Sequence, residues 1–284
     1  MAAKQILLIT GGNTGLGYEA VKALYASATP YEILLGSRKI SNGEQAIEKL
    51  KEEVKESASS VSVVQADVSS DESLEKLVNG IESKYGKLDV LINNAGASFD
   101  GALQSGQMSI REAYNASWDT NVSGTQVLTT LAMPLLFKSS QPRLLFVTSG
   151  TSSLIQTDLS DGIFARLNAA PDAGWPKQGQ FNPVTSYRST KTGLNMLMRE
   201  WVKILRNDPV KVFAVSPGFL ATGLGGMGAE QMKKVSRRLR WVQIGAQDPA
   251  IGGKFIRDVV EGKRDQYEGQ IVRSDFFDDP VQPY

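Results

Sequence analysis

Short runs of apolar residues alternate along the chain with longer segments in which apolar residues recur every three or four positions. The apolar runs predict strands at Gln5–Thr10, Tyr31–Ser37, Ser62–Ala66, Val90–Asn93, Arg143–Ser149, Lys211–Val215 and Gly269–Val272. The periodic segments predict helices near Leu16–Ser27, Gly43–Glu56, Asp71–Tyr85, Ile110–Lys138, Thr185–Arg206 and Pro249–Val260. Because almost continuously apolar strands alternate with helices, we expect an α/β, doubly wound fold, with helices on both faces of a seven-stranded, mostly parallel sheet.

No linker, internal repeat or low-complexity run divides the 284 residues, so we expect one domain over residues 1–284. The stretch at about 151–183 breaks the alternation, because it is rich in Gly, Pro, Asn and Asp and has no clear period. Irregular segments of that length are uncommon inside a compact domain and are usually functional. We therefore expect an inserted segment there, and a small substrate lobe at about 219–245.

Composition narrows the chemistry. Lys plus Arg number 31 and Asp plus Glu 30, and this balance gives no electrostatic reason to expect nucleic acid or an anionic membrane as a partner. The chain has no Cys and no His, which excludes thiol and Ser-His-Asp catalysis and leaves acid–base work to Asp, Glu, Lys or Tyr. We expect no metal site. The first apolar run is too short for a signal peptide and no membrane-length run follows, so we expect a cytoplasmic protein.

A glycine-rich loop over Thr10–Gly17 follows the first strand and opens the first helix. Glycines let the backbone approach a pyrophosphate closely, and a helix N-terminus offers free N–H groups to it. The alternative is an ordinary glycine-rich turn. An NAD site usually has an acidic residue at the end of the second strand, but here the strand runs into Arg38. A guanidinium suits the 2′-phosphate of NADP, although Arg38 and Lys39 could equally be a solvated pair.

A tyrosine precedes a lysine by four residues twice, at Tyr187–Lys191 and at Tyr18–Lys22. This spacing places a phenol and an ammonium on one helix face but is weak evidence alone. We interpret the second case as a surface pair behind the glycine loop. For the first case, other residues are predicted at the carboxyl edge of the sheet, where ligands bind. They are Asn93–Gly96, Ser149 and Pro217-Gly218, and Asn121 is expected as a buried amide within a helix. Singly these residues could be turn or bend residues, but together they are specific.

In these motifs the chain resembles the short-chain dehydrogenase/reductase family, from Thr10 to about Thr222, and in particular its NADPH-dependent carbonyl reductases. The resemblance implies a Rossmann-type fold and NADPH or NADP+ as cofactor. It implies a catalytic tetrad of Asn121, Ser149, Tyr187 and Lys191. It also implies that the cofactor is held by Gly11, Asn13, Thr14, Gly15, Leu16, Gly17, Arg38, Asp67, Val68, Asn94, Ala95, Gly96, Tyr187, Lys191, Pro217, Gly218 and Thr222. Asp67 would hold the adenine amino group, and Asn94 would stabilise the sheet around the cofactor.

Two features depart from the family pattern. The expected Ile-Ser-Ser at the end of the fifth strand is Val147-Thr148-Ser149 here, so the choice of serine depends on one register. The interval between Ser149 and Tyr187 is much longer than in most relatives and resembles the insertion of carbonyl-reductase-like members.

Reduction of a carbonyl needs a hydride at carbon and a proton at oxygen. A free tyrosine has a pKa of about 10, and an ammonium about 5 Å away would favour the phenolate by about 3 kcal/mol, or about two pKa units. We therefore expect Tyr187 as general acid/base, with Lys191 lowering its pKa and Ser149 bonding the substrate oxygen. In family terms, Asn121 retains a water that relays protons to Lys191. The expected function is NADPH-dependent reduction of a ketone or aldehyde; the alternative is a catalytically inactive NADP(H)-binding sensor or scaffold. An extended-type sugar-nucleotide epimerase is disfavoured by the glycine spacing.

The inserted segment bears on partners. We expect a small carbonyl or alcohol as substrate, in a pocket lined by Ala97–Phe99, the insertion and Phe219–Trp241. The aromatic residues of the insertion favour an apolar or aromatic carbonyl. The insertion holds too many apolar groups to leave in water, so we expect it to cover the helices that relatives use for assembly, which slightly favours a monomer. These groups are Leu154, Ile155, Ile163, Phe164, Leu167, Trp175 and Phe181.

Overall fold

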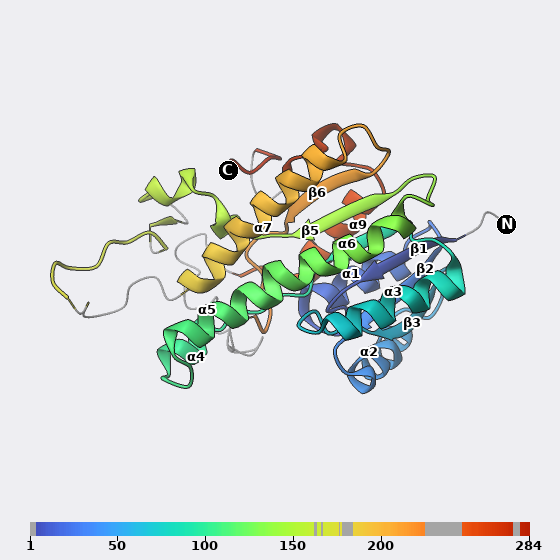
Figure 1. The fold of residues 1–284 in the computed structure, drawn as a ribbon, viewed down its shortest axis with the longest axis horizontal. Coiled ribbons are helices and arrows are strands. Elements are labelled where there is room, and N and C mark those ends of the chain that lie inside the picture. Colours follow the sequence, from blue (N-terminus) through green and yellow to red (C-terminus); the bar gives the residue numbers. More distant parts are fainter. Residues whose placement is uncertain are drawn as a thin grey trace.

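Seven strands form one sheet in the order β3-β2-β1-β4-β5-β6-β7, and neighbouring strands pair in parallel throughout (Figure 1). The computed structural model describes residues 4–161, 164–165, 167–175, 177, 184–224, 246–274 and 279–284. The strands are β1 Gln5–Ile9, β2 Tyr31–Ser37, β3 Ser60–Gln65, β4 Val90–Asn93, β5 Arg143–Val147, β6 Lys211–Ser216 and β7 Ile271–Arg273. The predicted fold class is confirmed. The strand order reverses between β1 and β4, and in open parallel sheets ligands bind in the crevice at the carboxyl ends of the strands at such a point.

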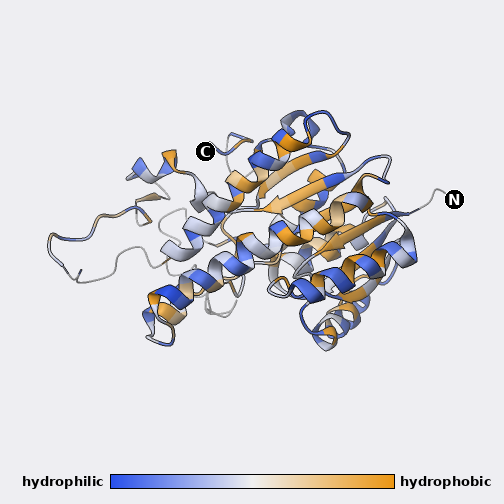
Figure 2. Cartoon of the chain, in the orientation of Figure 1, coloured by the Kyte–Doolittle hydropathy of each residue, from blue (hydrophilic) through white to orange (hydrophobic). Residues whose placement is uncertain are grey.

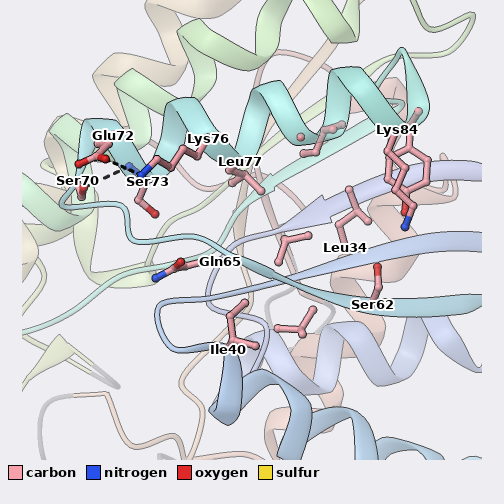
Figure 3. A pocket seen from close by; sticks show the side chains of 15 residues that line it. Leu34, Ile40, Ser62, Gln65, Ser70, Glu72, Ser73, Lys76, Leu77 and Lys84 are labelled. Atoms are coloured by element: carbon pink, nitrogen blue, oxygen red, sulfur yellow. Dashed lines mark hydrogen bonds and ion pairs between the residues drawn. The ribbon is translucent and has the colours of Figure 1, made fainter.

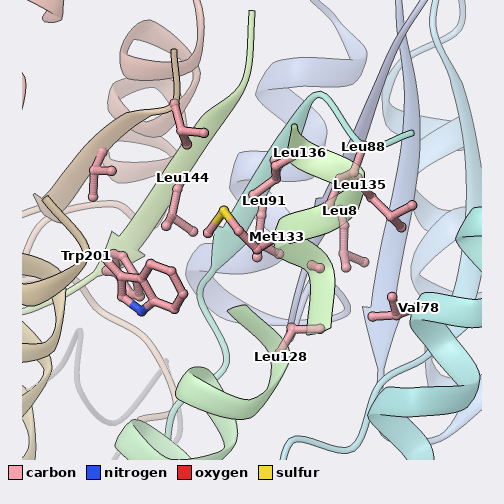
Figure 4. Close-up of a cluster of buried hydrophobic side chains, with 14 of the residues drawn as sticks. Leu8, Val78, Leu88, Leu91, Leu128, Met133, Leu135, Leu136, Leu144 and Trp201 are labelled. Atoms are coloured by element: carbon pink, nitrogen blue, oxygen red, sulfur yellow. The ribbon is translucent and has the colours of Figure 1, made fainter. Parts of the chain in front are cut away.

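Helices cover both faces of the sheet. They are α1 Gly15–Tyr25, α2 Ile40–Glu53, α3 Asp71–Tyr85, α4 Asp100–Gln104, α5 Ile110–Trp118, α6 Gly124–Leu136, α7 Thr185–Ile204 and α9 Pro249–Val260. One buried cluster joins the sheet to α3, α6 and α7 (Figure 4), and a second joins it to α1, α2 and α9. Figure 2 shows hydrophobic residues concentrated along the strands, as burial on both faces requires.

The prediction of one regular helix from Ile110 to Lys138 is wrong in its middle. One π-helical turn over Asp119–Ser123 separates α5 from α6. Single π turns of this kind are frequent at functional sites, because the extra residue redirects a side chain. Here the turn contains Asn121, whose side chain is fully buried and bonded to neighbouring elements.

The inserted segment differs from its prediction. Figure 1 shows it extending away from the sheet beyond α7. Leu154, Ile155 and Trp175 are 63%, 64% and 87% exposed, so the expectation that the insertion buries its apolar groups is wrong for these three. Ile163 and Phe181 lie outside the described residues, as does most of the expected substrate lobe. The monomeric state stays a prediction, which light scattering on a sizing column tests.

Candidate active site

The glycine loop between β1 and α1 has the backbone that close approach to a ligand requires. Gly11 and Gly15 adopt φ of +63° and +54°, a region that side chains disfavour. A Cβ on Gly17 would lie 2.1 Å from the carbonyl oxygen of Gly11, so only glycine fits this crossing. The Asn94 amide donates to the carbonyl oxygens of Thr10 (2.8 Å) and Gly11 (3.3 Å), and this pair of bonds fixes the loop against the end of β4.

The first turn of α1 is open to an anion. Its N-cap residue, Thr14, is exposed and makes no side-chain capping bond, so the first N–H groups of the helix lack that partner. Two neighbouring predicted residues lie in different surroundings. Asn13 is half-buried in the loop. The Leu16 side chain points toward α9, where a Cβ on Gly252 would lie 2.8 Å from it.

The next three predicted residues, Arg38, Asp67 and Val68, follow the ends of β2 and β3. Arg38 is exposed after β2, and its guanidinium makes no hydrogen bond or ion pair within the described part of the chain. Asp67 follows β3 and accepts a hydrogen bond from the N–H of Ser69 at 3.1 Å. Val68 is buried, and its carbonyl lies so close to Gly124 of α6 that a Cβ there would clash at 1.8 Å. This contact sets how near α6 comes to the crevice.

The Tyr187 phenol lies near the N-terminus of α7, in hydrogen-bond contact with the Ser149 hydroxyl two residues beyond β5. Burial raises the pKa of Tyr187 to about 12, and the Ser149 hydrogen bond offsets only part of that rise. The phenol of the protein without ligand therefore has a raised pKa because desolvation dominates, and the expectation that Lys191 lowers this pKa stays a prediction. The Ser149 hydroxyl also accepts from the N–H of Thr151 at 3.2 Å.

Lys191 lies one turn further along α7 and is 4% exposed. Its Nζ is 5.7 Å from the centre of the Tyr187 ring and donates to the carbonyl oxygen of Val147 at 2.9 Å. Burial lowers the pKa of Lys191 to about 8. A Cβ on Gly96 would lie 3.4 Å from this Nζ, so the small residue leaves the ammonium its room. The lysine therefore holds a proton that it can lose near neutral pH.

Asn121 acts on the loop that follows β4. Its Oδ1 accepts from the N–H of Ala97 (2.8 Å), and its Nδ2 donates to the Ala97 carbonyl (2.8 Å) and to the Thr190 hydroxyl (2.9 Å). A Cβ on Gly96 would lie 3.0 Å from Oδ1, so Asn121 and Lys191 flank the same glycine. The amide therefore clamps the loop to the helix that carries the tyrosine.

Asp100 is a functional neighbour that the sequence analysis missed. Its carboxylate is 4% exposed and accepts from the N–H groups of Ser186 (2.9 Å) and Tyr187 (3.0 Å). The N-cap position of α7 is Val184, which has no polar side chain to do this. Asp100 thus caps the helix from a distant part of the chain. The only local signal was that apolar N-cap residue.

A second group of missed residues supports Ser149 from behind. The Thr148 hydroxyl donates to Asn195 Oδ1 at 2.6 Å, and Asn195 Nδ2 donates to the Ser152 hydroxyl at 2.8 Å. The Ser152 hydroxyl in turn donates to the Ser149 carbonyl at 2.6 Å. The opposite wall is the Pro217-Gly218 turn after β6, where Gly218 has φ of +98°.

Thr222 completes the set of predicted residues. It lies beyond the Pro217-Gly218 turn, and a Cβ on Gly15 would meet its side chain at 3.6 Å. The predicted residues of the loop, the sheet edge and α7 therefore lie at the carboxyl ends of the strands.

Comparison with known proteins gives the family. The model of the family described as short chain dehydrogenase matches residues 5–158. The short-chain dehydrogenase/reductase eupG of a Phoma species is 47% identical over 266 residues, covering 93% of this chain and 92% of the relative. The short-chain dehydrogenase/reductase tropE of Talaromyces stipitatus is 41% identical over 289 residues, covering 100% and 99%. This chain belongs to the short-chain dehydrogenase family.

Solved structures agree on the fold of this short-chain dehydrogenase. A variant of actinorhodin polyketide ketoreductase with NADPH superposes with a TM-score of 0.70 at 18% identity, covering 96% of this chain and 97% of that one. RhlG of Pseudomonas aeruginosa, in a complex with NADP, superposes with a TM-score of 0.71 at 18% identity, covering 96% and 95%.

The second tyrosine–lysine pair of this short-chain dehydrogenase is not the surface pair we expected. Tyr18 is 4% exposed, and its hydroxyl donates to Glu53 Oε2 at 3.1 Å. The Lys22 Nζ lies 2.6 Å from the same oxygen. The expectation failed because α2 packs over α1 and brings a carboxylate onto the pair. Burial first, and then the Glu53 hydrogen bond, raise the pKa of Tyr18 far above its ordinary value.

A groove of about 550 Å³ lies between α3 and the β2–β3 edge, with Ile40 of α2 below (Figure 3). Lys76 and Glu72 pair across one turn of α3 at its rim. None of the four predicted catalytic residues lines this groove. No group of three or more metal-ligating side chains occurs among the described residues, and no helix in the described part of the chain could span a membrane.

Proposed function

We propose that this short-chain dehydrogenase reduces a ketone or aldehyde to an alcohol with NADPH, and that Tyr187 is the general acid. The observation that carries the proposal is the convergence of three side chains at one edge of the sheet. The Tyr187 phenol is in hydrogen-bond contact with Ser149, and the Lys191 ammonium is 5.7 Å from the phenol ring. A proton donor, a hydrogen-bond donor for oxygen and a cation are the groups that carbonyl reduction needs.

The residues present fit a dinucleotide. The positive φ of Gly11 and Gly15 and the uncapped first turn of α1 suit a pyrophosphate. Exposed Arg38 suits a 2′-phosphate better than a bare ribose, because a guanidinium binds phosphate with two parallel bonds. In the proposed complex Asp67, which follows β3, would bind the adenine, and Lys191, beside Gly96, would face the nicotinamide ribose.

In the proposed mechanism, Ser149 and Tyr187 both donate hydrogen bonds to the carbonyl oxygen of the substrate. The bound cofactor supplies the hydride that the carbonyl carbon accepts. As the carbon–oxygen double bond becomes single, the phenol proton of Tyr187 passes to that oxygen and yields the alcohol. Because the pKa of Tyr187 is about 12 before ligands bind, the phenol enters the reaction protonated, as reduction requires. Lys191 then stabilises the phenolate that forms.

Related proteins support the reductive direction. Actinorhodin polyketide ketoreductase, which shares this fold, is by its name a ketone reductase and was solved with NADPH. Salutaridine reductase of Papaver somniferum is 27% identical over 285 residues, covering 80% of this chain and 87% of that one. These names belong to those proteins, but they favour a carbonyl on a bulky, largely apolar molecule as the substrate class here.

The experiment that tests the proposal is a screen of ketones and aldehydes for NADPH consumption, with NADH in parallel. We expect turnover with NADPH and at least about tenfold weaker binding of NADH, the scale of one lost charge-assisted contact. Arg38→Asp should weaken NADPH binding and narrow that difference, and Lys39→Asp is its matched control. Equal affinity of the unmodified protein for both cofactors would contradict the role of Arg38. Tight cofactor binding without turnover of any carbonyl would favour the sensor alternative.

A further inference from the structure

The tail of the chain returns to the active site. After β7, residues 279–284 run back along the strand: the Gln282 N–H donates to the Ile271 carbonyl at 2.8 Å, and the Arg273 N–H donates to the Pro280 carbonyl at 2.8 Å. The Arg273 side chain is nearly buried and donates to the carbonyl oxygens of Asp279 (3.1 Å) and Val281 (2.9 Å). The tail is therefore fastened to the sheet by main-chain and side-chain bonds.

One side chain of the tail contacts the turn that carries Ser149. Gln282 is 1% exposed, and its Nε2 donates to the Ser149 carbonyl oxygen and to the Ser152 hydroxyl, both at 3.1 Å. The Ser149 carbonyl thus accepts three hydrogen bonds, one from Gln282 and two from Ser152, through its hydroxyl (2.6 Å) and its N–H (3.1 Å). These bonds act on the backbone and do not involve the Ser149 hydroxyl, which is hydrogen-bonded to Thr151 and interacts with Tyr187.

The end of the tail holds the far side of the same turn. The main-chain oxygen of Tyr284 accepts from the Ile155 N–H (3.2 Å) and from the Ser153 hydroxyl (3.3 Å). The Arg199 guanidinium of α7 lies 5.5 Å from the centre of the Tyr284 ring. Residues 149–155 are therefore held at both ends by residues 282–284, at the point where the exposed insertion leaves the core.

We infer that Gln282 is a positioning residue for catalysis, which sets the place of the Ser149 hydroxyl through the Ser149 carbonyl; the inference rests on the proposed function. A serine on a loop needs such support, because a shift of about 1 Å in a group that contacts the reacting oxygen can lower the rate about 100-fold. Among the described residues the Gln282 side chain bonds Ser149 and Ser152 and not the glycine loop or Arg38, so its loss should affect the chemical step and leave cofactor binding unchanged.

The test is Gln282→Met, which keeps the length of the side chain and removes the donor. We expect kcat to fall about tenfold, while the Kd for NADPH, measured by fluorescence titration, stays within about twofold of wild type. Gln126→Met is the matched control, because Gln126 in α6 also makes a side-chain hydrogen bond, its Oε1 accepting from Trp201 Nε1 at 2.9 Å, and this bond involves neither Ser149 nor Ser152. We expect Gln126→Met to keep the wild-type kcat.

Ser152→Ala is the second variant, and it removes the hydroxyl bond of Ser152 to the Ser149 carbonyl while the bonds from Gln282 and from the Ser152 N–H remain. It should lower kcat in the same way, and Gln282→Met should cost less in its background than in wild type, because both act through one carbonyl. Wild-type kcat in Gln282→Met, or in Ser152→Ala if the first variant does not fold, would overturn the inference. Full activity in Tyr187→Phe would instead overturn the proposed function, so the two failures are distinguishable.

Discussion

Two tyrosine–lysine pairs with the same spacing occur in this protein, and only one of them has a carboxylate as a hydrogen-bond partner. Tyr18 and Lys22 in α1 share the carboxylate of Glu53, whereas Tyr187 and Lys191 in α7 have a serine hydroxyl and a main-chain carbonyl as partners. Both tyrosines have raised pKa values because both are desolvated. The phenol alone therefore does not distinguish an active site from a core contact.

The lysines make the difference. The hydrogen bond to Glu53 raises the pKa of Lys22, so this ammonium keeps its proton, and the Glu53 carboxylate balances its charge. Lys191 has no ion pair among the described residues, and burial lowers its pKa to about 8. Its charge is therefore available to a phenolate or to the hydroxyl groups of a bound ribose. We infer that a tyrosine–lysine pair can serve acid–base chemistry when no carboxylate forms an ion pair with the lysine.

The largest expected effect is on kcat, and it comes from removing the phenol hydroxyl of one pair and not of the other. Tyr187→Phe should lower kcat at least about 100-fold, the scale of a lost general acid, and leave the Kd for NADPH near wild type. Tyr18→Phe should change kcat little, although it should reduce the free energy of unfolding by about 1 kcal/mol because the Glu53 hydrogen bond is lost. Single-turnover kinetics and urea unfolding of both variants measure this. Similar losses of kcat in both would contradict the distinction between the pairs.

The sequence predicted the parts of this site whose signals are local. The strand ends at Asn93 and Ser37 and the glycine loop follow from apolar runs and turn residues, and the structure has them at those positions. Asp100 and Gln282 could not be predicted, because each acts on a backbone group 87 and 133 positions away, and a lone acid or amide gives no sign of such a partner. The burial of Tyr18 was missed for the same reason, since Glu53 comes from another helix.

The second prediction concerns the pKa of the unpaired lysine. Its folded value of about 8 lies below the ordinary 10.5, so between these values the unfolded chain binds more protons and stability rises with pH. Compared with Lys191→Met, wild type should therefore gain about 2 kcal/mol in free energy of unfolding from about pH 7.5 to 9.5. Urea unfolding at both pH values checks this. Lys22→Met is the control, since Lys22 has a raised pKa and should give no such gain. A constant difference between wild type and Lys191→Met would contradict the lowered pKa.

A smaller effect is expected from the caps of the two helices. Neither α1 nor α7 has a capping side chain at its own N-cap, but α7 is capped by Asp100 while the first turn of α1 faces the crevice. Asp100→Asn keeps one acceptor oxygen and loses the other, so the backbone at Tyr187 should be held less firmly. We expect kcat to fall about tenfold, or about 1.4 kcal/mol in activation free energy, with the Kd for NADPH unchanged. Asp71→Asn, in the exposed first turn of α3, is the control and should keep the wild-type kcat.

The smallest effect should come from changing Glu53, the carboxylate that distinguishes the α1 pair from the α7 pair. Glu53→Gln leaves an acceptor for the Tyr18 hydroxyl but removes the charge partner of Lys22, in a pair whose side chains are 35% and 32% exposed. A pair this open to solvent contributes about 1 kcal/mol or less, so urea unfolding should show a loss within that limit. The Lys22 hydrogen bond lowers the pKa of Glu53, so the difference from wild type should be present above about pH 4.5 and disappear as the pH falls through the lowered value. Turnover should not change, because α1 presents its N-terminus and not this pair to the crevice. A rise or fall of kcat in Glu53→Gln would mean that the α1 pair is coupled to catalysis after all.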